Sequence, residues 1–213
     1  MSAISLKEQQ LRLREEAVLQ AVNRLLAQKG YDAMTVDEVA AAVGLTKPSL
    51  YKHFASKEAL ASAALVRLLD QTLATIAAQP ADAPAADKLQ AVLRWALSQH
   101  LRGEMPLLPS TRSSLRDALL KDPDYVTRLQ AVGTALIDWI EAAQRAGALS
   151  PALPAEVILY TLYARTCDPV LEFLQASGQY EDAQVVELVL ATCFDGLRAR
   201  PSAAPARSAS RRR

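Results

Sequence analysis

The sequence predicts an all-α fold, and three observations support this. Hydrophobic residues make up 51% of the 213 residues but aromatics only 5%, so the apolar share rests on alanine and leucine, which favour helices. Glycine is rare, with 7 residues. Valine, isoleucine and threonine are scattered among helix formers instead of alternating in runs bounded by turn residues, which argues against a β-rich fold.

Two helices are predicted at the start of the chain. Hydrophobic residues that share one face predict a helix from about residue 6 to residue 29, and Gly30 is expected to end it as a left-handed cap. Thr35 is expected to begin the next helix as its N-cap, and Glu38 three residues later completes a capping box.

A sharp turn and a third helix follow. Gly44 supplies the positive φ that such a turn needs, and Leu45 fills the angle between the two helices. Thr46 is expected to cap the third helix, with Pro48 in its first turn, and the helix runs to about Phe54. Residues 35–54 are therefore predicted to form a helix-turn-helix.

The rest of the chain is predicted to be helical as well. Ser56 is expected to cap a fourth helix that ends near Pro80. Further helices are predicted over 88–102, 115–120, 123–146, 155–176 and 182–199. Pro169 lies inside one of them and predicts a kink near Asp168. The last helix is apolar nearly all round, so it must be covered on more than one side.

Several functional classes are not expected from this sequence. We find no GxSxG, HExxH, GxGxxG or Walker-type sequence, so an enzyme, a cofactor and a metal site are not predicted. No apolar run approaches about 18 residues and no signal peptide is recognisable, which predicts a cytoplasmic protein without a membrane partner. Cys167 and Cys193 lack a CxxC pair or a nearby histidine, which fits reduced core thiols, although a redox sensor stays an alternative.

One segment of the helix-turn-helix is locally basic, although the net charge of the chain is only +1. From Thr46 to Lys57 the chain carries three lysines and His53 but no carboxylate, the local electropositive surface that phosphates require. Leu50 and Phe54 share one face of the third helix and are expected to pack inward. The other face is then equipped to contact DNA.

The ordered motif resembles the signature of the TetR family of transcriptional regulators. The resemblance rests on GYDAMTVDEVA at 30–40, GLTKPSLYKHF at 44–54 and SKEAL at 56–60, and it covers roughly residues 10–60. It implies a homodimer that reads palindromic operator DNA, represses transcription and is released by a small-molecule effector. It also implies a helix-turn-helix domain over 1–56 and a helical effector-binding and dimerisation domain over 57–199. The segment over 200–213 is rich in Pro, Ala, Ser and Arg and lacks the apolar residues needed to fold, which predicts a basic, disordered tail.

The resemblance also assigns the DNA contacts. It implies that Thr35, Thr46, Tyr51 and Lys57 mainly hold phosphates. Residues expected to approach the bases or the neighbouring backbone are Lys47, Pro48, Ser49, Lys52 and His53. The six arginines between Leu197 and Arg213 either add non-specific DNA affinity or only aid solubility.

Two further sets of residues are expected in the C-terminal domain. Bulky side chains with polar tips are candidates to line a cavity for an apolar or aromatic effector, or simply to fill the core: Trp95, His100, Met105, Trp139, Tyr160, Tyr163 and Phe173. The last two helices resemble the family's dimer interface, with Val186, Val189, Leu190, Cys193, Phe194 and Leu197 as candidate contacts. The alternative function is a helical interaction protein that recruits a partner through its apolar C-terminal helices.

Overall fold

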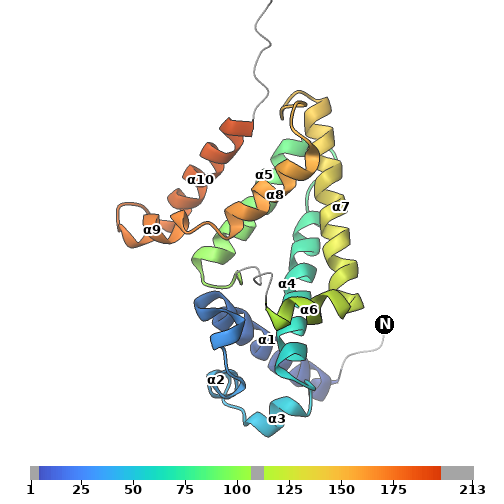
Figure 1. Cartoon of the computed structure of the whole chain (residues 1–213), viewed down its shortest axis with the longest axis vertical. Helices are drawn as coiled ribbons and strands as arrows, with labels where there is room; N and C mark the ends of the chain where they lie inside the picture. The colour runs from blue at the N-terminus through green and yellow to red at the C-terminus, as the bar shows by residue number, and fades with distance from the viewer. Residues whose placement is uncertain (1–4, 107–112, 198–213) are drawn as a thin grey trace, which may run out of the picture.

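The computed structural model describes residues 5–106 and 113–197, and every regular element in those ranges is an α-helix (Figure 1). The helices are α1 (Leu6–Ala33), α2 (Val36–Ala42), α3 (Lys47–Tyr51), α4 (Lys57–Ala77), α5 (Ala85–Leu101), α6 (Ser114–Lys121), α7 (Pro123–Arg145), α8 (Ala155–Thr166), α9 (Val170–Ala176) and α10 (Asp182–Leu197). The all-α prediction is confirmed. The predicted tail over 200–213 lies outside the described residues.

A first hydrophobic core holds the N-terminal part together, which we call the head. It joins α1, α2, α3, the first half of α4 and, from further along the chain, α6. Val22 and Val39 are completely buried, and Met34, Leu50 and Leu60 are 1% exposed. Leu115 and Leu119 of α6 pack into the same core. The head therefore includes residues beyond the 1–56 segment proposed from the sequence.

A second core fills the C-terminal domain. Residues of α5, α7, α8, α9 and α10 make it up, and Leu69, Leu73 and Ile76 from the second half of α4 pack against it. Figure 1 shows α10 at one edge of this domain, α7 at the opposite edge and α8 crossing between them. α10 packs against α5 and α9, and α8 packs against α5 and α7.

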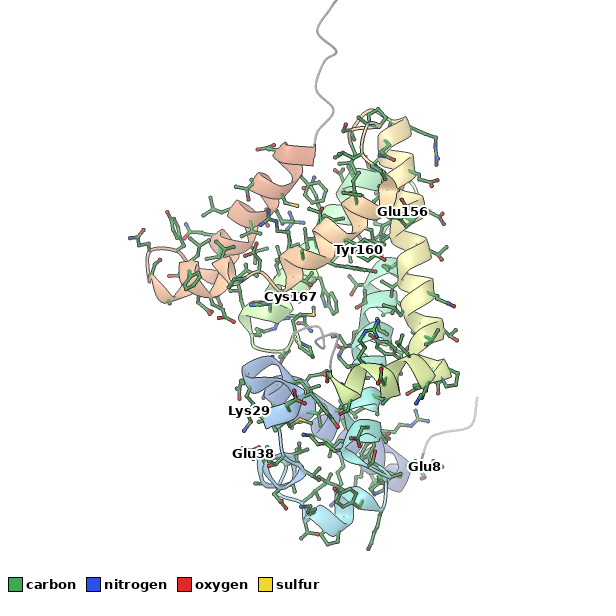
Figure 2. All side chains as sticks on the ribbon, viewed as in Figure 1. Glu8, Lys29, Glu38, Glu156, Tyr160 and Cys167 are labelled. Carbon is green, nitrogen blue, oxygen red and sulfur yellow. The ribbon has the colours of Figure 1, made fainter. Side chains whose placement is uncertain are left out.

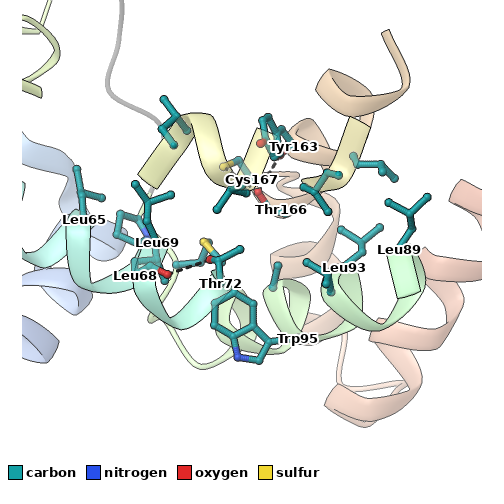
Figure 3. A pocket seen from close by; sticks show the side chains of 18 of the residues that line it. Leu65, Leu68, Leu69, Thr72, Leu89, Leu93, Trp95, Tyr163, Thr166 and Cys167 are labelled. Carbon is teal, nitrogen blue, oxygen red and sulfur yellow. Dashed lines mark hydrogen bonds between the residues drawn. The ribbon is translucent and has the colours of Figure 1, made fainter. Parts of the chain in front are cut away.

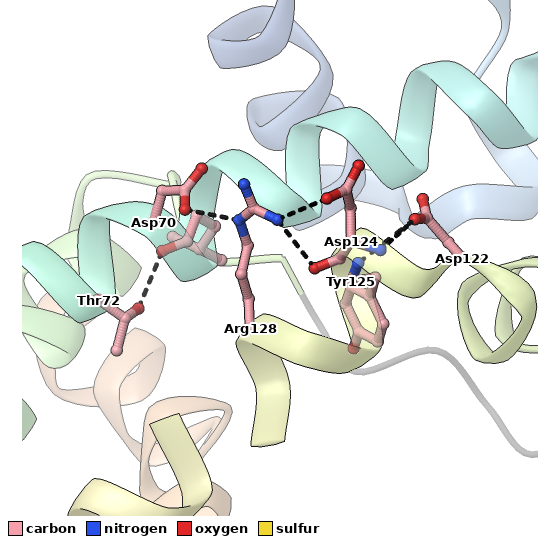
Figure 4. A network of polar contacts seen from close by, with 7 residues as sticks. Asp70, Thr72, Asp122, Asp124, Tyr125 and Arg128 are labelled. Atoms are coloured by element: carbon pink, nitrogen blue, oxygen red, sulfur yellow. Dashed lines mark hydrogen bonds and ion pairs between the residues drawn. The ribbon is translucent and has the colours of Figure 1, made fainter. Parts of the chain in front are cut away.

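Helix α4 belongs to both cores and so connects them. Arg67 pairs with Glu16 of α1 through two bonds of 2.6 and 2.7 Å. One turn later, Asp70 accepts a hydrogen bond of 2.6 Å from Arg128 of α7, which also pairs with Asp124 (Figure 4). These ion pairs tie α4 to α1 on one side and to α7 on the other.

The composition of α4 differs from the expectation that no stretch is long and apolar enough to cross a membrane. Its 21 residues pass that test by length and mean hydropathy, alone among the described helices. Packing explains the composition, because α4 contacts α1, α5, α6 and α7. Its Arg67 and Asp70, which are 36% and 45% exposed, form ion pairs with α1 and α7.

Three helix ends differ from the prediction. Gly30 has a φ of 73° as expected, but the chain resumes helical geometry and α1 ends only at Ala33. α3 ends at Tyr51, and Phe54 is instead held by a turn in which its N–H donates to the Leu50 carbonyl. The helix predicted over 155–176 is two helices, because the chain leaves helical geometry at Cys167 and the Asp168 carboxylate accepts a hydrogen bond from the N–H of Val170.

Candidate DNA-binding surface and effector cavity

The start of α2 is built by the predicted capping box. Thr35 Oγ1 accepts from the backbone N–H of Glu38 at 3.3 Å, and the Glu38 carboxylate accepts from the backbone N–H of Thr35 at 2.9 Å. Lys29 of α1 also binds this carboxylate. Hydrogen bonds from Lys29 and Thr35 lower the pKa of Glu38 to about 2. The carboxylate is therefore ionised at neutral pH and committed to holding α1 and α2 together.

The turn before α3 also follows the sequence signals. Gly44 has a φ of 65°, and the N–H of Leu45 donates to the Ala40 carbonyl at 2.9 Å. Thr46 is the N-cap of α3, with its hydroxyl 3.4 Å from the backbone nitrogen of Ser49. Leu50 is 1% exposed and fixes the inner face of α3 in the head core. The outer face is therefore held in place by local caps and one buried anchor.

The residues proposed to contact DNA surround α3. The structure exposes Thr35, Thr46, Lys47, Pro48, Tyr51, Lys52 and His53, and leaves Ser49 and Lys57 half-buried. Figure 1 shows α3 at one end of the molecule, with α2 beside it and the C-terminal domain at the opposite end. A DNA duplex laid against this end would meet the outer face of α3 first.

Two of the lysines have partners that the sequence pattern did not indicate. Lys47 Nζ lies 2.8 Å from the Asp37 carboxylate of α2. Lys57 Nζ lies 4.2 Å from the centre of the Tyr31 ring and donates to the Asp32 carbonyl at 3.4 Å. The segment 46–57 carries no acid of its own, yet folding brings Asp37 to its first lysine. This contact depends on the angle between α2 and α3, which the sequence pattern does not give.

A cavity of about 160 Å³ lies inside the C-terminal domain, among α4, α5, α7 and α8 (Figure 3). Its lining includes Leu65, Leu68, Leu69, Thr72, Leu89, Val92, Leu93, Trp95, Ala96, Met105, Pro106, Tyr125, Leu129, Val132, Leu136, Leu162, Tyr163, Thr166 and Cys167. Among these described residues there is no Asp, Glu, Lys, Arg or His. The cavity wall is therefore almost entirely apolar.

The polar atoms of the cavity are few and uncharged. Thr72 donates its hydroxyl to the Leu68 carbonyl at 2.9 Å, and Thr166 donates to the Tyr163 carbonyl at 2.8 Å. Burial raises the pKa of Tyr163 to about 12 and also raises the pKa of Tyr125. Both phenols are therefore protonated at neutral pH and can donate a hydrogen bond to a ligand.

Three of the seven side chains proposed for an effector line this cavity: Trp95, Met105 and Tyr163. The other four lie elsewhere. His100 is buried with Nδ1 2.7 Å from the Thr166 carbonyl oxygen, and Trp139 packs against the C-terminal core near Lys88. Tyr160 and Phe173 are 68% and 73% exposed. Sequence reasoning missed the apolar residues of α4, because their stripe reads equally well as ordinary core.

The residues proposed for dimerisation face inward in the protomer. Val186, Val189, Leu190, Cys193 and Phe194 are all 6% exposed or less and belong to the C-terminal core, while the side chain of Leu197 lies outside the described residues. Other apolar side chains of α8 and α10 are open to solvent. Val157 is 50% exposed, Tyr160 68% and Leu188 43%. Figure 2 labels Tyr160 on α8.

Comparisons with known proteins match the N-terminal part of the chain to a described family. Residues 18–64 match a family model described as bacterial regulatory proteins, tetR family. The regulator EthR of Mycobacterium tuberculosis is 36% identical over 72 residues, which are 32% of this chain and 33% of EthR. The chain thus matches this curated relative over only about a third of its length.

Similarity to solved structures extends over most of the chain. The fatty acid degradation regulator FadR from Bacillus halodurans superposes with a TM-score of 0.65 at 17% identity, over 88% of this chain and 97% of FadR. FadR from Bacillus subtilis, solved in complex with stearoyl-CoA, gives 0.60 at 16% identity, over 86% of this chain and 99% of its own. At this identity the likeness concerns the fold alone.

Proposed function

We propose that this chain, whose residues 18–64 match the tetR family of bacterial regulatory proteins, is a DNA-binding transcriptional regulator of that family, most simply a repressor released from its operator by a small molecule. One observation carries the proposal: α3 is anchored by buried Leu50 and exposes Lys47, Tyr51 and Lys52 at one end of the molecule. Such side chains hydrogen-bond to phosphates and base edges. The site of action is the cytoplasm, where bacterial DNA is found.

The proposed DNA-binding unit is a homodimer on a palindromic site. A single recognition helix contacts few base pairs, and two half-sites about 34–36 Å apart are read by a symmetric pair. Exposed apolar side chains on α8 and α10, among them Val157, Tyr160 and Leu188, favour these helices as the interface. Covering them would remove apolar surface from water.

The proposed effector is uncharged and apolar. A charged ligand would lose its hydration in this cavity without an opposite charge among the described lining residues. The volume is 160 Å³, and a cavity of about 150 Å³ accommodates benzene. We therefore propose a ligand about the size of one aromatic ring. An acyl chain as long as that in the FadR complex would require the cavity to enlarge.

Two segments connect the cavity to the head, and both favour release of DNA when a ligand fills the cavity. Leu65, Leu68 and Leu69 of α4 line the cavity, and the same helix packs into the head core. Glu104 accepts hydrogen bonds from Gln20 at 2.9 Å and Arg24 at 2.8 Å, both in α1. The next residue, Met105, lines the cavity. A ligand that binds better to a state with displaced helices would shift the population away from DNA.

The test is selection of bound sequences from random duplex DNA, followed by a screen for small molecules that release the enriched duplex. We expect a palindromic consensus and a dimer in the complex. An effector must bind the free dimer more tightly than the operator-bound dimer, by the same factor with which it weakens operator binding. No enrichment over the starting pool would reject sequence-specific DNA binding.

A further inference from the structure

The exposed end of the head carries a carboxylate bound directly to a lysine that is proposed to contact DNA. Asp37 lies in the first turn of α2, and its Oδ2 accepts a hydrogen bond of 2.8 Å from Nζ of Lys47, the first residue of α3. The side chains are 68% and 45% exposed. The turn at Gly44 brings the starts of the two helices together, although the residues are ten apart in sequence.

Neither stability nor affinity accounts for this pair. Ion pairs between exposed side chains contribute little to folding because water and salt screen them. A carboxylate beside the phosphate backbone is repelled, and a lysine paired with it adds no net positive charge to the surface. The pair therefore weakens the sequence-independent attraction to DNA, and its effect must be sought in discrimination between sequences.

We propose that Asp37 is a positioning residue that determines sequence specificity by holding the Lys47 ammonium toward the base edges and away from the phosphates. This rests on the proposed function. An ammonium has three N–H donors, and the bond to Asp37 occupies one of them. The others remain free to donate to O6 and N7 of a guanine in the major groove.

In this arrangement the Asp37 carboxylate weakens binding to non-specific DNA more than binding to the operator. On a sequence that lacks acceptors at this position, Lys47 stays with Asp37 and the carboxylate still repels the nearby phosphates. On the operator, the base contacts of Lys47 offset that repulsion. The device acts by penalising wrong sequences rather than by strengthening the right one.

Lys57 provides the contrast within the same surface. Its ammonium lies over the Tyr31 ring and donates to a backbone carbonyl, neither of which carries a negative charge. Lys57 therefore has no direct bond to a carboxylate among the described residues, although its charge acts on the neighbouring Glu58. The two lysines divide between them sequence reading and sequence-independent attraction.

The experiment measures the affinity of the full-length dimer for the selected operator and for a scrambled duplex, across a series of salt concentrations. We expect Asp37→Asn to tighten non-specific binding about 10-fold and to steepen its salt dependence by about 0.9 in the logarithmic slope, because the freed Lys47 neutralises one more phosphate. Operator affinity should change less, so that discrimination, the ratio of the affinity for the operator to that for the scrambled duplex, falls. Asp37→Glu keeps the carboxylate and should retain discrimination.

Two controls separate positioning from bulk charge. Asp32→Asn removes the same charge from an exposed residue of the head that does not bind Lys47, and it should leave discrimination unchanged. In a Lys47→Ala background, Asp37→Asn should no longer alter discrimination, since the group it acts through is gone. Far-ultraviolet circular dichroism confirms that each variant is folded.

The outcomes are distinct. Unchanged discrimination in Asp37→Asn, with a wild-type protein that does prefer its operator, would overturn this inference and leave the proposed function standing. If Asp32→Asn tightened non-specific binding and lowered discrimination as much as Asp37→Asn, the inference would also be overturned, in favour of an effect of bulk charge. A wild-type protein without any sequence preference would instead defeat the proposed function.

Discussion

The proposed site of the head lies outside its hydrophobic core, whereas the proposed site of the C-terminal domain lies inside its own core. In the head, the core lies inside and the DNA-contacting side chains stand on exposed short helices. In the C-terminal domain, the core itself contains the cavity, bordered by Leu136, Leu162 and other residues that would otherwise fill it. An outer site can change without loss of packing, whereas an inner site cannot.

The cavity lowers stability in a way that the DNA surface does not. The apolar side chains that border an unfilled space lose the dispersion contacts that a packed core would give them. A hollow retained at this cost fits a function that needs the space.

The largest effect is expected at the surface of the C-terminal domain. Tyr160→Glu with Leu188→Glu places charge on exposed parts of α8 and α10 and should give folded monomers with at least 100-fold weaker operator binding. Val189→Glu instead buries a charge in the core and should unfold the domain. Sedimentation and circular dichroism distinguish the two outcomes. A folded dimer in the double variant would place the interface elsewhere.

The next effect tests the surface of the head. Tyr51→Ala and Lys52→Ala should each weaken operator binding about 10-fold without unfolding, because both side chains are exposed on or beside α3. Lys57→Ala should weaken binding to all sequences alike and reduce its salt dependence. Titrations on operator and scrambled duplexes measure both. Unchanged binding in all three folded variants would reject this docking surface.

The inner site is tested by filling it. Ala96 lines the cavity and is 6% exposed, so the larger side chain of Ala96→Leu should occupy part of the space. The free energy of unfolding should rise by about 1 kcal/mol. Release of the operator by an effector should be lost, while operator affinity stays as in the wild type. Gly133→Ala, at a helical position of α7 with nothing within 4 Å of the added methyl, is the control for a surface change. Full effector response in Ala96→Leu would exclude this cavity.

The same division explains what could be predicted from the sequence. Thr35, Glu38, Gly44 and Thr46 take the roles expected of them, because caps and turns depend on residues a few positions apart. The pairing of Asp37 with Lys47 could not be foreseen, since it depends on how two helices cross. Local rules therefore cover most of the head.

In the C-terminal domain the decisive features are non-local. α10 is apolar nearly all round, so its pattern does not say which side faces the protomer's own core, and the inward side of Val189 and Phe194 was proposed as the interface. Tyr160 and Phe173 were proposed as cavity residues from their chemistry alone, yet both are exposed. The sequence predicted only a kink at Pro169, whereas the structure shows a break, with the N–H of Val170 donating to the Asp168 carboxylate.

The smallest expected effect is on stability and concerns two capping boxes, one at the start of α1 and one at the start of α2. The two boxes have the same chemistry but different surroundings. Glu38 is bound by Thr35 and by Lys29 of another helix, and its pKa is lowered to about 2. Glu8 is bound by Ser5 and its pKa is also lowered, mainly by the Ser5 backbone and side-chain hydrogen bonds. A carboxyl whose pKa is lower in the folded state stabilises the fold above its unfolded pKa, and that contribution is lost as pH falls through the folded value.

For Glu38 this loss is expected between about pH 4.5 and about pH 2. Glu38→Gln should therefore be less stable than the wild type at pH 6, and the difference should shrink as the pH approaches 2. Glu8→Gln removes a capping carboxylate at the exposed start of α1 and should show a smaller difference at pH 6, because no second helix depends on it. Thermal unfolding of both variants and the wild type at pH 6, 4 and 2 measures this. An equal pH dependence in the two variants would mean that the contact between Lys29 and Glu38 adds nothing to the cap itself.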